Sequence, residues 1–505
     1  MAEPVVLHLD SITKRFGSFA ANDAISIELR RGEVIALLGE NGAGKTTLMN
    51  ILFGHYVPDE GEVYIEGRKI PHGKPKEAIA AGVGMVHQHF SLAKNLSVLE
   101  NVMTGTEPLS SWRSETAKGK RKLKSLEEKF GLLVDTDARV GDLSVGEQQR
   151  VEILKALYNN ARILILDEPT GVLTQQEAEG LFKTLRAMAK DGLSIIFISH
   201  KLHEVMSGAD KVVVLRAGKV IAERNTDATS KEELAELMVG RQVERPVREA
   251  SKPGDVVVQA RDVALHAGST ARLTDITFDI RAGETLGIVG VSGNGQAALC
   301  DLVAGVAHAD HGTFEINGRE VSHMTPRDLS SMDVGRTPED RNSQGAVGEL
   351  TLWENAVLER INDRRFSKHG FLNKREGRSY CQDLIDRFDV RGGTPNSRIS
   401  LLSGGNMQKL ILGRSLSKHP VFLLAAQPTR GLDEGAIAAI HQDILEARKN
   451  GTAILLVSED LDEVVSLSDR IMAIHGGRLS PAVDAKEVDS RQLGLMMAGE
   501  WGGLG

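Results

Sequence analysis

Short apolar runs, each bounded by turn residues, recur along the chain and alternate with longer stretches of helical periodicity. Uniformly apolar runs of this length are typical of strands that are buried on both faces of a parallel sheet. The alternation therefore predicts an α/β fold with a largely parallel sheet in each half of the chain. The runs are 163–166, 194–198 and 211–215 in the first half, and 421–424, 453–457 and 470–474 in the second.

The two halves also resemble each other in sequence. The segment Leu143-Ser144-Val145-Gly146 recurs as Leu402-Ser403-Gly404-Gly405, and Pro169-Thr170 recurs as Pro428-Thr429. A repeat of this length indicates a duplicated domain rather than a solenoid unit. We expect a first domain over 1–242, a linker over 243–255 that contains two prolines, and a second domain over 256–505.

A phosphate-loop motif, Gly-x-x-x-x-Gly-Lys-Ser/Thr, lies in the first half between an apolar run, 34–38, and a helical pattern. Glycines let backbone N–H groups turn toward a polyphosphate, and the N-terminus of the following helix adds positive potential. Lys45 supplies a cation to the β- and γ-phosphates, and the Thr46 hydroxyl is a ligand for Mg²⁺. The predicted nucleotide-binding residues are Gly39, Glu40, Asn41, Gly42, Ala43, Gly44, Lys45, Thr46 and Thr47.

Polar residues follow three of the apolar runs. Asp167 and Glu168 end the run 163–166, an ending that in isolation only marks a strand meeting solvent. Downstream of a phosphate loop, it predicts that Asp167 joins the Mg²⁺ shell and that Glu168 polarises an attacking water. His200, at the end of the run 194–198, is placed to contact the γ-phosphate, although alone it would more often be an ordinary polar cap. Gln88 also follows a short apolar run and is predicted to reach the metal or the water.

The repeated Leu-Ser-x-Gly segment precedes a helical pattern in each half. Ser144 has Glu147 three residues later, which predicts a capping box at the start of a helix. Capping would fully explain a single copy. A second copy at the equivalent place, beginning at Ser403, makes capping a less sufficient explanation.

The order of these motifs resembles the ATP-binding subunits of ABC transporters, over nearly the whole chain and twice. The resemblance implies two tandem P-loop ATPase domains, each with a largely parallel sheet flanked by helices and with a helical subdomain. It implies that two ATP molecules are sandwiched head to tail, and it places Phe16, which alone would more often be a core residue, against adenine. The segment of the second half that would complete the Lys45 site is Ser403, Gly404, Gly405 and Asn406.

The second half lacks the residues on which this chemistry depends. Gln296 and Ala297 stand where the first half has Lys45 and Thr46. The remaining replacements are Ala426 for Asp167, Gln427 for Glu168, Glu459 for His200 and Glu339 for Gln88. The sequence therefore predicts one intact composite site and one degenerate site that hydrolyses ATP poorly.

The composition of the chain limits the cellular compartment and the class of protein that it fits. The chain has 505 residues, 41% apolar and 26% charged, with a net charge of −8, which argues against a general nucleic-acid binder. No apolar run approaches the ~18 residues of a membrane span, and no secretory signal is evident at the N-terminus. Cys300 and Cys381 have no metal-type spacing. We expect a cytoplasmic chain, which the resemblance places peripherally on the cytoplasmic face of the inner membrane.

Fused halves with a degenerate second half look like the importer ATPases for simple sugars and nucleosides, and the segment 87–92 looks more like the nucleoside branch. The resemblance implies two membrane-spanning permease subunits and an extracytoplasmic solute-binding protein as partners. A soluble twin-ATPase factor acting on ribosomes is the alternative, but such factors carry a long charged linker and two intact sites. A DNA-repair or chromosome ATPase would need zinc-binding cysteines or long heptad arms, and the sequence has neither. The solute and the identity of the permease subunits stay open.

Overall fold

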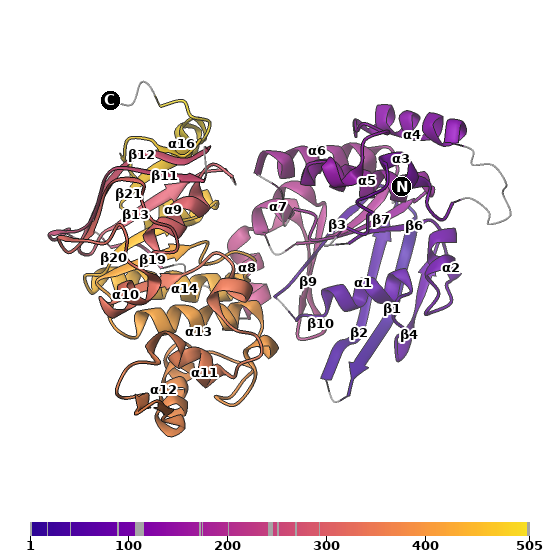
Figure 1. The fold of residues 1–505 in the computed structure, drawn as a ribbon. Coiled ribbons are helices and arrows are strands. Elements are labelled where there is room, and N and C mark those ends of the chain that lie inside the picture. The colour runs from indigo at the N-terminus through magenta and orange to yellow at the C-terminus, as the bar shows by residue number, and fades with distance from the viewer. Residues whose placement is uncertain are drawn as a thin grey trace. The chain divides into compact units, whose positions relative to one another are not determined.

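The computed structural model describes residues 3–17, 19–40, 42–87, 90–106, 116–170, 173, 175–199, 201–240, 246–249, 252–267, 270–291 and 293–501. The chain divides into two compact units, Met1–Val243 and Glu244–Gly505, each of which is an α/β layered structure (Figure 1). Within the residues just given, no helix has both the length and the apolar character needed to cross a membrane.

Each unit is built on a largely parallel sheet. The order β10-β9-β3-β8-β7-β6 of the first unit recurs as β22-β21-β13-β20-β19-β16 in the second, with β23 paired to β21. Only the strands at one edge are antiparallel. The fold predicted from the apolar runs is thus confirmed. The strands are β3 (Val34–Leu38), β6 (Val83–Val86), β7 (Ile163–Asp167), β8 (Ser194–Ile198), β9 (Lys211–Arg216), β10 (Lys219–Asn225), β13 (Thr285–Val289), β16 (Val334–Thr337), β19 (Phe422–Ala426), β20 (Ala453–Val457), β21 (Arg470–His475), β22 (Arg478–Leu479) and β23 (Val483–Asp484).

The central strand β3 shows why these runs are apolar throughout. Its five residues are all buried. Successive side chains of a strand point to opposite faces, so Ile35 and Leu37 enter one core and Val34, Ala36 and Leu38 enter the other. A sheet covered on both faces leaves no position for a polar side chain until the strand ends, which is where the candidate site lies.

A smaller antiparallel sheet covers one face of each parallel sheet. Its order is β2-β1-β4-β5 in the first unit and β12-β11-β14-β15 in the second. The core on this side also contains the helix that follows the phosphate loop. The strands are β1 (Val5–Phe16), β2 (Phe19–Arg30), β4 (Glu60–Ile65), β5 (Arg68–Lys69), β11 (Val256–Ala267), β12 (Thr270–Arg281), β14 (His311–Ile316) and β15 (Arg319–Glu320).

Helices cover the other face and form a helical group in each unit. The group contains α3, α4 and α5 in the first unit and α11, α12 and α13 in the second, and its members contact one another. The first-unit helices are α1 (Lys45–Phe53), α2 (Pro75–Ala80), α3 (Val98–Met103), α4 (Thr116–Phe130), α5 (Val145–Tyr158), α6 (Gln175–Lys190), α7 (Leu202–Gly208) and α8 (Lys231–Val239). Those of the second unit are α9 (Gln296–Val303), α10 (Pro326–Ser331), α11 (Leu352–Val357), α12 (Lys374–Arg387), α13 (Gly404–Leu416), α14 (Glu434–Lys449), α15 (Leu461–Leu467) and α16 (Ser490–Met497).

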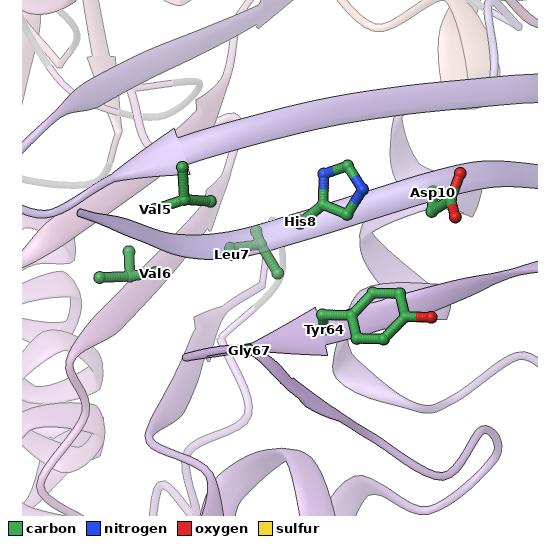
Figure 2. Close-up of a pocket in the computed structure, with 7 residues that line it drawn as sticks. All are labelled: Val5, Val6, Leu7, His8, Asp10, Tyr64 and Gly67. Atoms are coloured by element: carbon green, nitrogen blue, oxygen red, sulfur yellow. The ribbon is translucent and has the colours of Figure 1, made fainter. Parts of the chain in front are cut away.

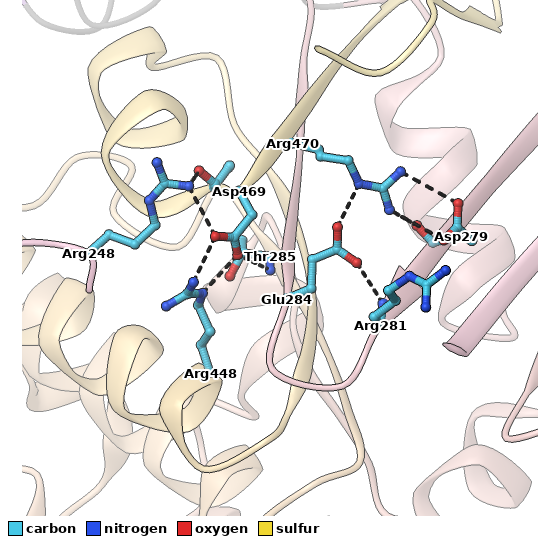
Figure 3. Close-up of polar contacts among 9 residues, drawn as sticks. Arg248, Asp279, Arg281, Glu284, Thr285, Arg448, Asp469 and Arg470 are labelled. Carbon is cyan, nitrogen blue, oxygen red and sulfur yellow. Dashed lines mark hydrogen bonds and ion pairs between the residues drawn. The ribbon is translucent and has the colours of Figure 1, made fainter. Parts of the chain in front are cut away.

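The described part of the connecting segment, 246–249, is held on the second unit by a shared carboxylate (Figure 3). Asp469 pairs with Arg248 at 3.2 Å and with Arg448 at 2.7 Å, and it accepts a hydrogen bond from the Thr285 N–H at 3.0 Å. Arg448 also donates to the Glu249 carbonyl at 3.0 Å. Because these guanidinium groups are largely buried and doubly bonded, this end of the segment has a fixed place on the second unit.

Candidate functional site

The phosphate loop of the first unit is a tight turn whose backbone requires glycine at particular positions. Gly42 and Gly44 have φ values of 83° and 97°, in the left-handed region. A Cβ on Gly44 would lie 2.0 Å from the Ala21 carbonyl oxygen, and one on Gly39 would lie 2.3 Å from the Leu215 carbonyl oxygen. The loop backbone is therefore fixed by its contacts with neighbouring strands.

Lys45 and the start of α1 supply positive potential to this loop. The Lys45 side chain is 6% exposed, and its Nζ donates to the carbonyl oxygens of Gly39 at 2.7 Å and of Glu40 at 3.0 Å. The helix begins after Gly44 without a side-chain cap, so its first N–H groups point into the loop. A cation beside uncapped N–H groups fits a bound phosphate chain.

Two carboxylates stand at the end of β7, opposite this loop. Asp167 is 6% exposed, and burial together with the neighbouring charge of Glu168 raises the pKa of its carboxyl to about 6, against the opposing effects of Lys45 and of the Thr46 hydroxyl that bonds it. An adjacent hydroxyl and carboxylate are the oxygen ligands that Mg²⁺ prefers, so the residues present fit this metal. Thus the structure places Lys45, Thr46 and Asp167 together.

Glu168 has a left-handed backbone, with φ 46°, which is a strained conformation for a residue with a side chain. Its N–H donates to the Ile198 carbonyl at 3.1 Å, so the strained turn is tied to the end of the adjacent strand β8. The side chain is partly exposed at this edge. The turn therefore directs Glu168 away from the position that a continued strand would give it.

A buried glutamate that the sequence analysis did not single out connects the ends of β7 and β8. Glu204 is 1% exposed and accepts hydrogen bonds from the hydroxyls of Thr170 at 2.5 Å and Ser199 at 2.8 Å. Lys201 lies 3.3 Å from the same carboxylate. The recurrence of the same three residue types in the second half was a signal that could have revealed this contact. Glu204 therefore joins the segment that follows β7 to the end of β8.

The predicted adenine contact, Phe16, lies on the surface rather than in the core. Its side chain is 50% exposed and meets Tyr56 edge to face, with the ring centroids 6.0 Å apart. The Lys14 ammonium lies 5.6 Å from the Phe16 centroid. An exposed aromatic ring at this place fits a stacking surface for a planar base.

The two Leu-Ser-x-Gly segments begin α5 and α13, but their serines are bonded differently. Ser144 forms the predicted capping box with Glu147, whose N–H donates to the Ser144 hydroxyl at 3.3 Å. The Ser403 hydroxyl has no cap bond to its helix and instead accepts from the Asn406 side chain at 2.9 Å. Helix capping therefore accounts for Ser144 and does not account for Ser403.

The second unit keeps the loop geometry without the cation. Gly293 and Gly295 are left-handed, and the amide of Gln296 donates to the Val291 carbonyl at 2.9 Å, as Lys45 does to its own loop. The Gln296 Oε1 atom is buried and has no hydrogen-bond partner. At the edge of this sheet Glu339 pairs with Arg430 at 2.5 Å. The second loop is thus neutral, and Glu339, the counterpart of Gln88, is paired with an arginine.

Three predicted residues, Asn41, Gln88 and His200, lie outside the described residues, so their predicted roles stay predictions. Within the residues that the structure describes, no group of three or more His, Cys, Asp or Glu side chains is placed to hold a metal by itself. A shallow cavity of about 340 Å³ lies between β1 and β4, lined by residues that include His8 and Tyr64 (Figure 2). None of the predicted site residues lines it, so we assign it no part in the chemistry.

Comparison with known proteins gives full-length similarities. The family described as "ABC transporter" matches residues 22–171 and 273–430, one match in each unit. The chain is similar to the "Nucleoside import ATP-binding protein NupA" of Lactococcus lactis subsp. cremoris, with 42% identity over 501 residues that cover 99% of each chain. It is also similar to the "Guanosine import ATP-binding protein NupO" of Bacillus subtilis, with 41% identity covering 98% of this chain and 97% of that relative.

A third relative and one solved structure extend the comparison. The "Glucose import ATP-binding protein TsgD13" of Haloferax volcanii is 41% identical and covers 99% of this chain and 96% of its own length. Among solved structures, an archaeal ribosome recycling factor in complex with a ribosomal stalk protein matches 96% of this chain and 92% of its own with a TM-score of 0.66. At 20% identity, this structural likeness shows the shared fold alone.

Proposed function

The chain belongs to the ABC transporter family of ATPases, and we propose that it powers the import of a nucleoside or simple sugar through separate membrane subunits. ATP is its nucleotide. At the site, the proposal rests on the hydrogen bond between the Thr46 hydroxyl and the Asp167 carboxylate, beside the buried Lys45. This contact places two oxygen ligands for a metal next to the ammonium group that would bind phosphate. Full-length relatives named for nucleoside import support the choice of importer.

Within this proposal the first unit holds the nucleotide. Lys45 and the uncapped N–H groups of α1 bind the β- and γ-phosphates, with Asn41 in the same loop, and Phe16 stacks on adenine. The residues that would hold Mg²⁺ are Thr46, Asp167 and Gln88. When bound, Mg²⁺ neutralises charge on the phosphate oxygens. The contacts of Thr46 and Asp167 with each other support their part in this set.

Hydrolysis depends on the polar residues at the strand ends. Glu168 accepts the proton of the attacking water, and its strained turn, fixed by the bond to Ile198, supports that position. His200 is proposed to contact the γ-phosphate, and Glu204 positions the segment from which His200 follows. Glu204 is a positioning residue, because it acts through the backbone of its neighbours.

We further propose that the second unit completes this site with Ser403, Gly404, Gly405 and Asn406. The support comes from the second unit itself, where the Ser403 hydroxyl is not used as a helix cap and α13 begins with two glycines. N–H groups at a helix start without a side-chain cap favour an anion. The matched segment of the first unit has its serine committed to Glu147 and would face the neutral loop at Gln296.

The proposed partners are two membrane-spanning permease subunits and an extracytoplasmic solute-binding protein, with this chain on the cytoplasmic face of the membrane. A groove of about 340 Å³ in the second unit supports the permease contact. Its walls include Leu329, Leu358 and Ile361, the last two of which are 38% and 40% exposed, and Glu359 and Arg327 lie among the lining residues. We assign it a short apolar segment of a permease subunit, since a groove of this kind buries such a segment well.

Among solutes we favour nucleosides, on the names of the relatives NupA and NupO and on the segment 87–92. The proposed domain limits are 1–242 and 256–505, joined by a linker over 243–255. The test is to express the chain with and without candidate permease subunits and to measure membrane association, ATPase rate and uptake of labelled nucleosides and sugars. We expect membrane association and nucleoside uptake only with the permease subunits. Association with ribosomes that is independent of those subunits would overturn the importer assignment.

A further inference from the structure

The second unit carries a small hairpin whose shape is fixed by its turn. Strands β17 (Ser367–Lys368) and β18 (Phe371–Leu372) pair antiparallel across two residues, His369 and Gly370. These two residues have φ values of 54° and 81°. Left-handed backbone at both central positions is the geometry of a type I′ turn, which matches the twist of a tight hairpin. The hairpin therefore has one defined orientation at its tip.

The base of the hairpin is anchored in the helical group. Phe366 is 1% exposed, and its ring lies 5.1 Å from that of Tyr380 on α12. The guanidinium groups of Arg360 and Arg365 lie 5.0 Å and 5.3 Å from the Phe366 centroid. The Asn373 N–H donates to the Phe366 carbonyl at 2.8 Å, which closes the base. The base of the hairpin therefore has a fixed place on the unit.

The tip carries an apolar ring in solvent. Phe371 is 81% exposed, and Leu372 beside it is 39% exposed. A single exposed apolar side chain is ordinary on a protein surface. Phe371 differs from such a residue because many charged side chains surround it.

The residues around the tip are strongly basic in a chain whose net charge is −8. Between Arg360 and Arg378 there are seven basic residues and two acidic ones. Both acids are neutralised locally, because Asp363 pairs with Arg360 at 2.7 Å and Glu376 with Arg365 at 3.1 Å. Within the described part of the chain, the other cations are exposed and form no ion pair within 4 Å. They are Arg364, Lys368, Lys374, Arg375 and Arg378. Hydrogen bonds from Thr351 and the charge of Lys374 lower the pKa of Glu354.

We propose that this hairpin contacts an anionic phospholipid surface, with Phe371 at the headgroup level and the cations on the lipid phosphates. An exposed apolar ring between cations is a combination that binds such an interface. A lipid surface is favoured over an acidic protein, since the apolar part is one projecting ring instead of a patch that a folded partner could cover. The hairpin follows the groove residues Leu358 and Ile361 in the chain, and only its orientation toward the membrane rests on the function proposed above.

The test uses the purified full chain with protein-free vesicles of phosphatidylcholine, with or without phosphatidylglycerol. We expect flotation only with the anionic lipid and a steep loss with added salt. Each cation near an anionic surface strengthens binding about fivefold. The triple change Lys368→Glu, Lys374→Glu and Arg375→Glu should therefore weaken binding at least about 100-fold. The triple change Arg319→Glu, Lys486→Glu and Arg491→Glu alters net charge equally at exposed sites outside the hairpin and should leave binding within about twofold of that of the unchanged chain.

A second variant reports the ring directly. Relative to the unchanged chain, which has three tryptophans, the Phe371→Trp variant should show additional emission that shifts to the blue and is quenched by brominated acyl chains only with anionic vesicles. Equal losses in the two triple variants would overturn the proposal, because binding would then follow net charge alone. Binding confined to membranes that contain the permease subunits would assign the hairpin to a protein contact and would also overturn it. Neither result depends on ATP hydrolysis or solute uptake, so failure here is separable from failure of the importer assignment.

Discussion

The two units carry the same backbone around their phosphate loops and differ in the groups that do chemistry. Glu168 and Gln427 occupy the same place after a buried strand, and both have φ 46°. The buried acceptor Glu204 recurs as Glu463, which accepts from Thr429 at 2.7 Å and from Ser458 at 2.6 Å. The strained turn thus persists in the unit that has lost the carboxylates.

This difference shows that the geometry of the site is maintained by residues outside the reacting set. A left-handed turn at a residue with a side chain costs on the order of 1–3 kcal/mol, and a buried carboxylate with two hydroxyl donors offsets that cost. In the second unit His441 adds a third contact to Glu463 at 3.1 Å, at a place where the first unit has Phe182. Replacement of the two strand-end carboxylates therefore leaves the fold of the second unit intact.

The largest expected effect separates the two phosphate loops. Lys45→Ala removes the loop cation and should reduce ATP hydrolysis by the assembled transporter to background, on the order of 10³-fold. Gln296→Ala removes only a neutral side chain that bonds its own loop, so turnover should change by no more than about threefold. The measurement is steady-state phosphate release. Near-normal turnover in Lys45→Ala, or equal loss in both variants, would refute a single intact site.

The second prediction concerns the matched strand-end residues. Glu168→Gln retains the shape of the side chain but removes the base, so hydrolysis should fall on the order of 10²-fold while ATP binding persists. The reverse change in the second unit, Gln427→Glu, should create no activity, because Ala426 and Gln296 still lack a metal ligand and a cation. Both rates are measured with ATP affinity in parallel. Weakened ATP binding with unchanged turnover per bound ATP would exclude Glu168 as the base.

The third prediction separates stability from catalysis at the two matched serines. Ser144→Arg breaks a capping box and should cost about 1 kcal/mol of stability while much of the ATPase rate remains. Ser403→Arg breaks no helix cap, yet it should nearly eliminate hydrolysis if Ser403 completes the Lys45 site. Thermal unfolding and ATPase rate are measured for both. Loss of activity confined to Ser144→Arg would reverse the proposed pairing of the units.

The smallest expected effect is a pH dependence specific to the second unit. Burial and the charge of Glu446 raise the pKa of Asp443 on α14 to about 7, against the opposing charges of Lys409 and Arg387. A pKa raised by folding means that stability is full below the unfolded value and is lost as pH rises through about 7. Asp443→Asn should therefore raise the Tm of this unit at pH 8 by roughly 2–4 °C and leave it unchanged near pH 4. The first unit has Thr184 at this place, and Thr184→Val should show no such pH dependence.

The sequence by itself determined the elements and was enough to predict a candidate site. The uniformly apolar runs predicted the parallel strands correctly, because burial on both faces leaves a local pattern in consecutive residues. The phosphate loop and the capping box at Ser144 were equally local, since each depends on residues a few positions apart. Duplication was readable because the second half repeats the same short segments.

Only the tertiary structure decided the contacts that hold these pieces in place. The bonds from Thr170 and Ser199 to Glu204 join two strand ends, and no periodicity within one element reports them. The same is true of the ion pair between Glu339 and Arg430, which lie far apart in the chain. The raised pKa of Asp167 has a similar origin, because burial and neighbouring charge depend on where the chain folds and not on the order of its residues.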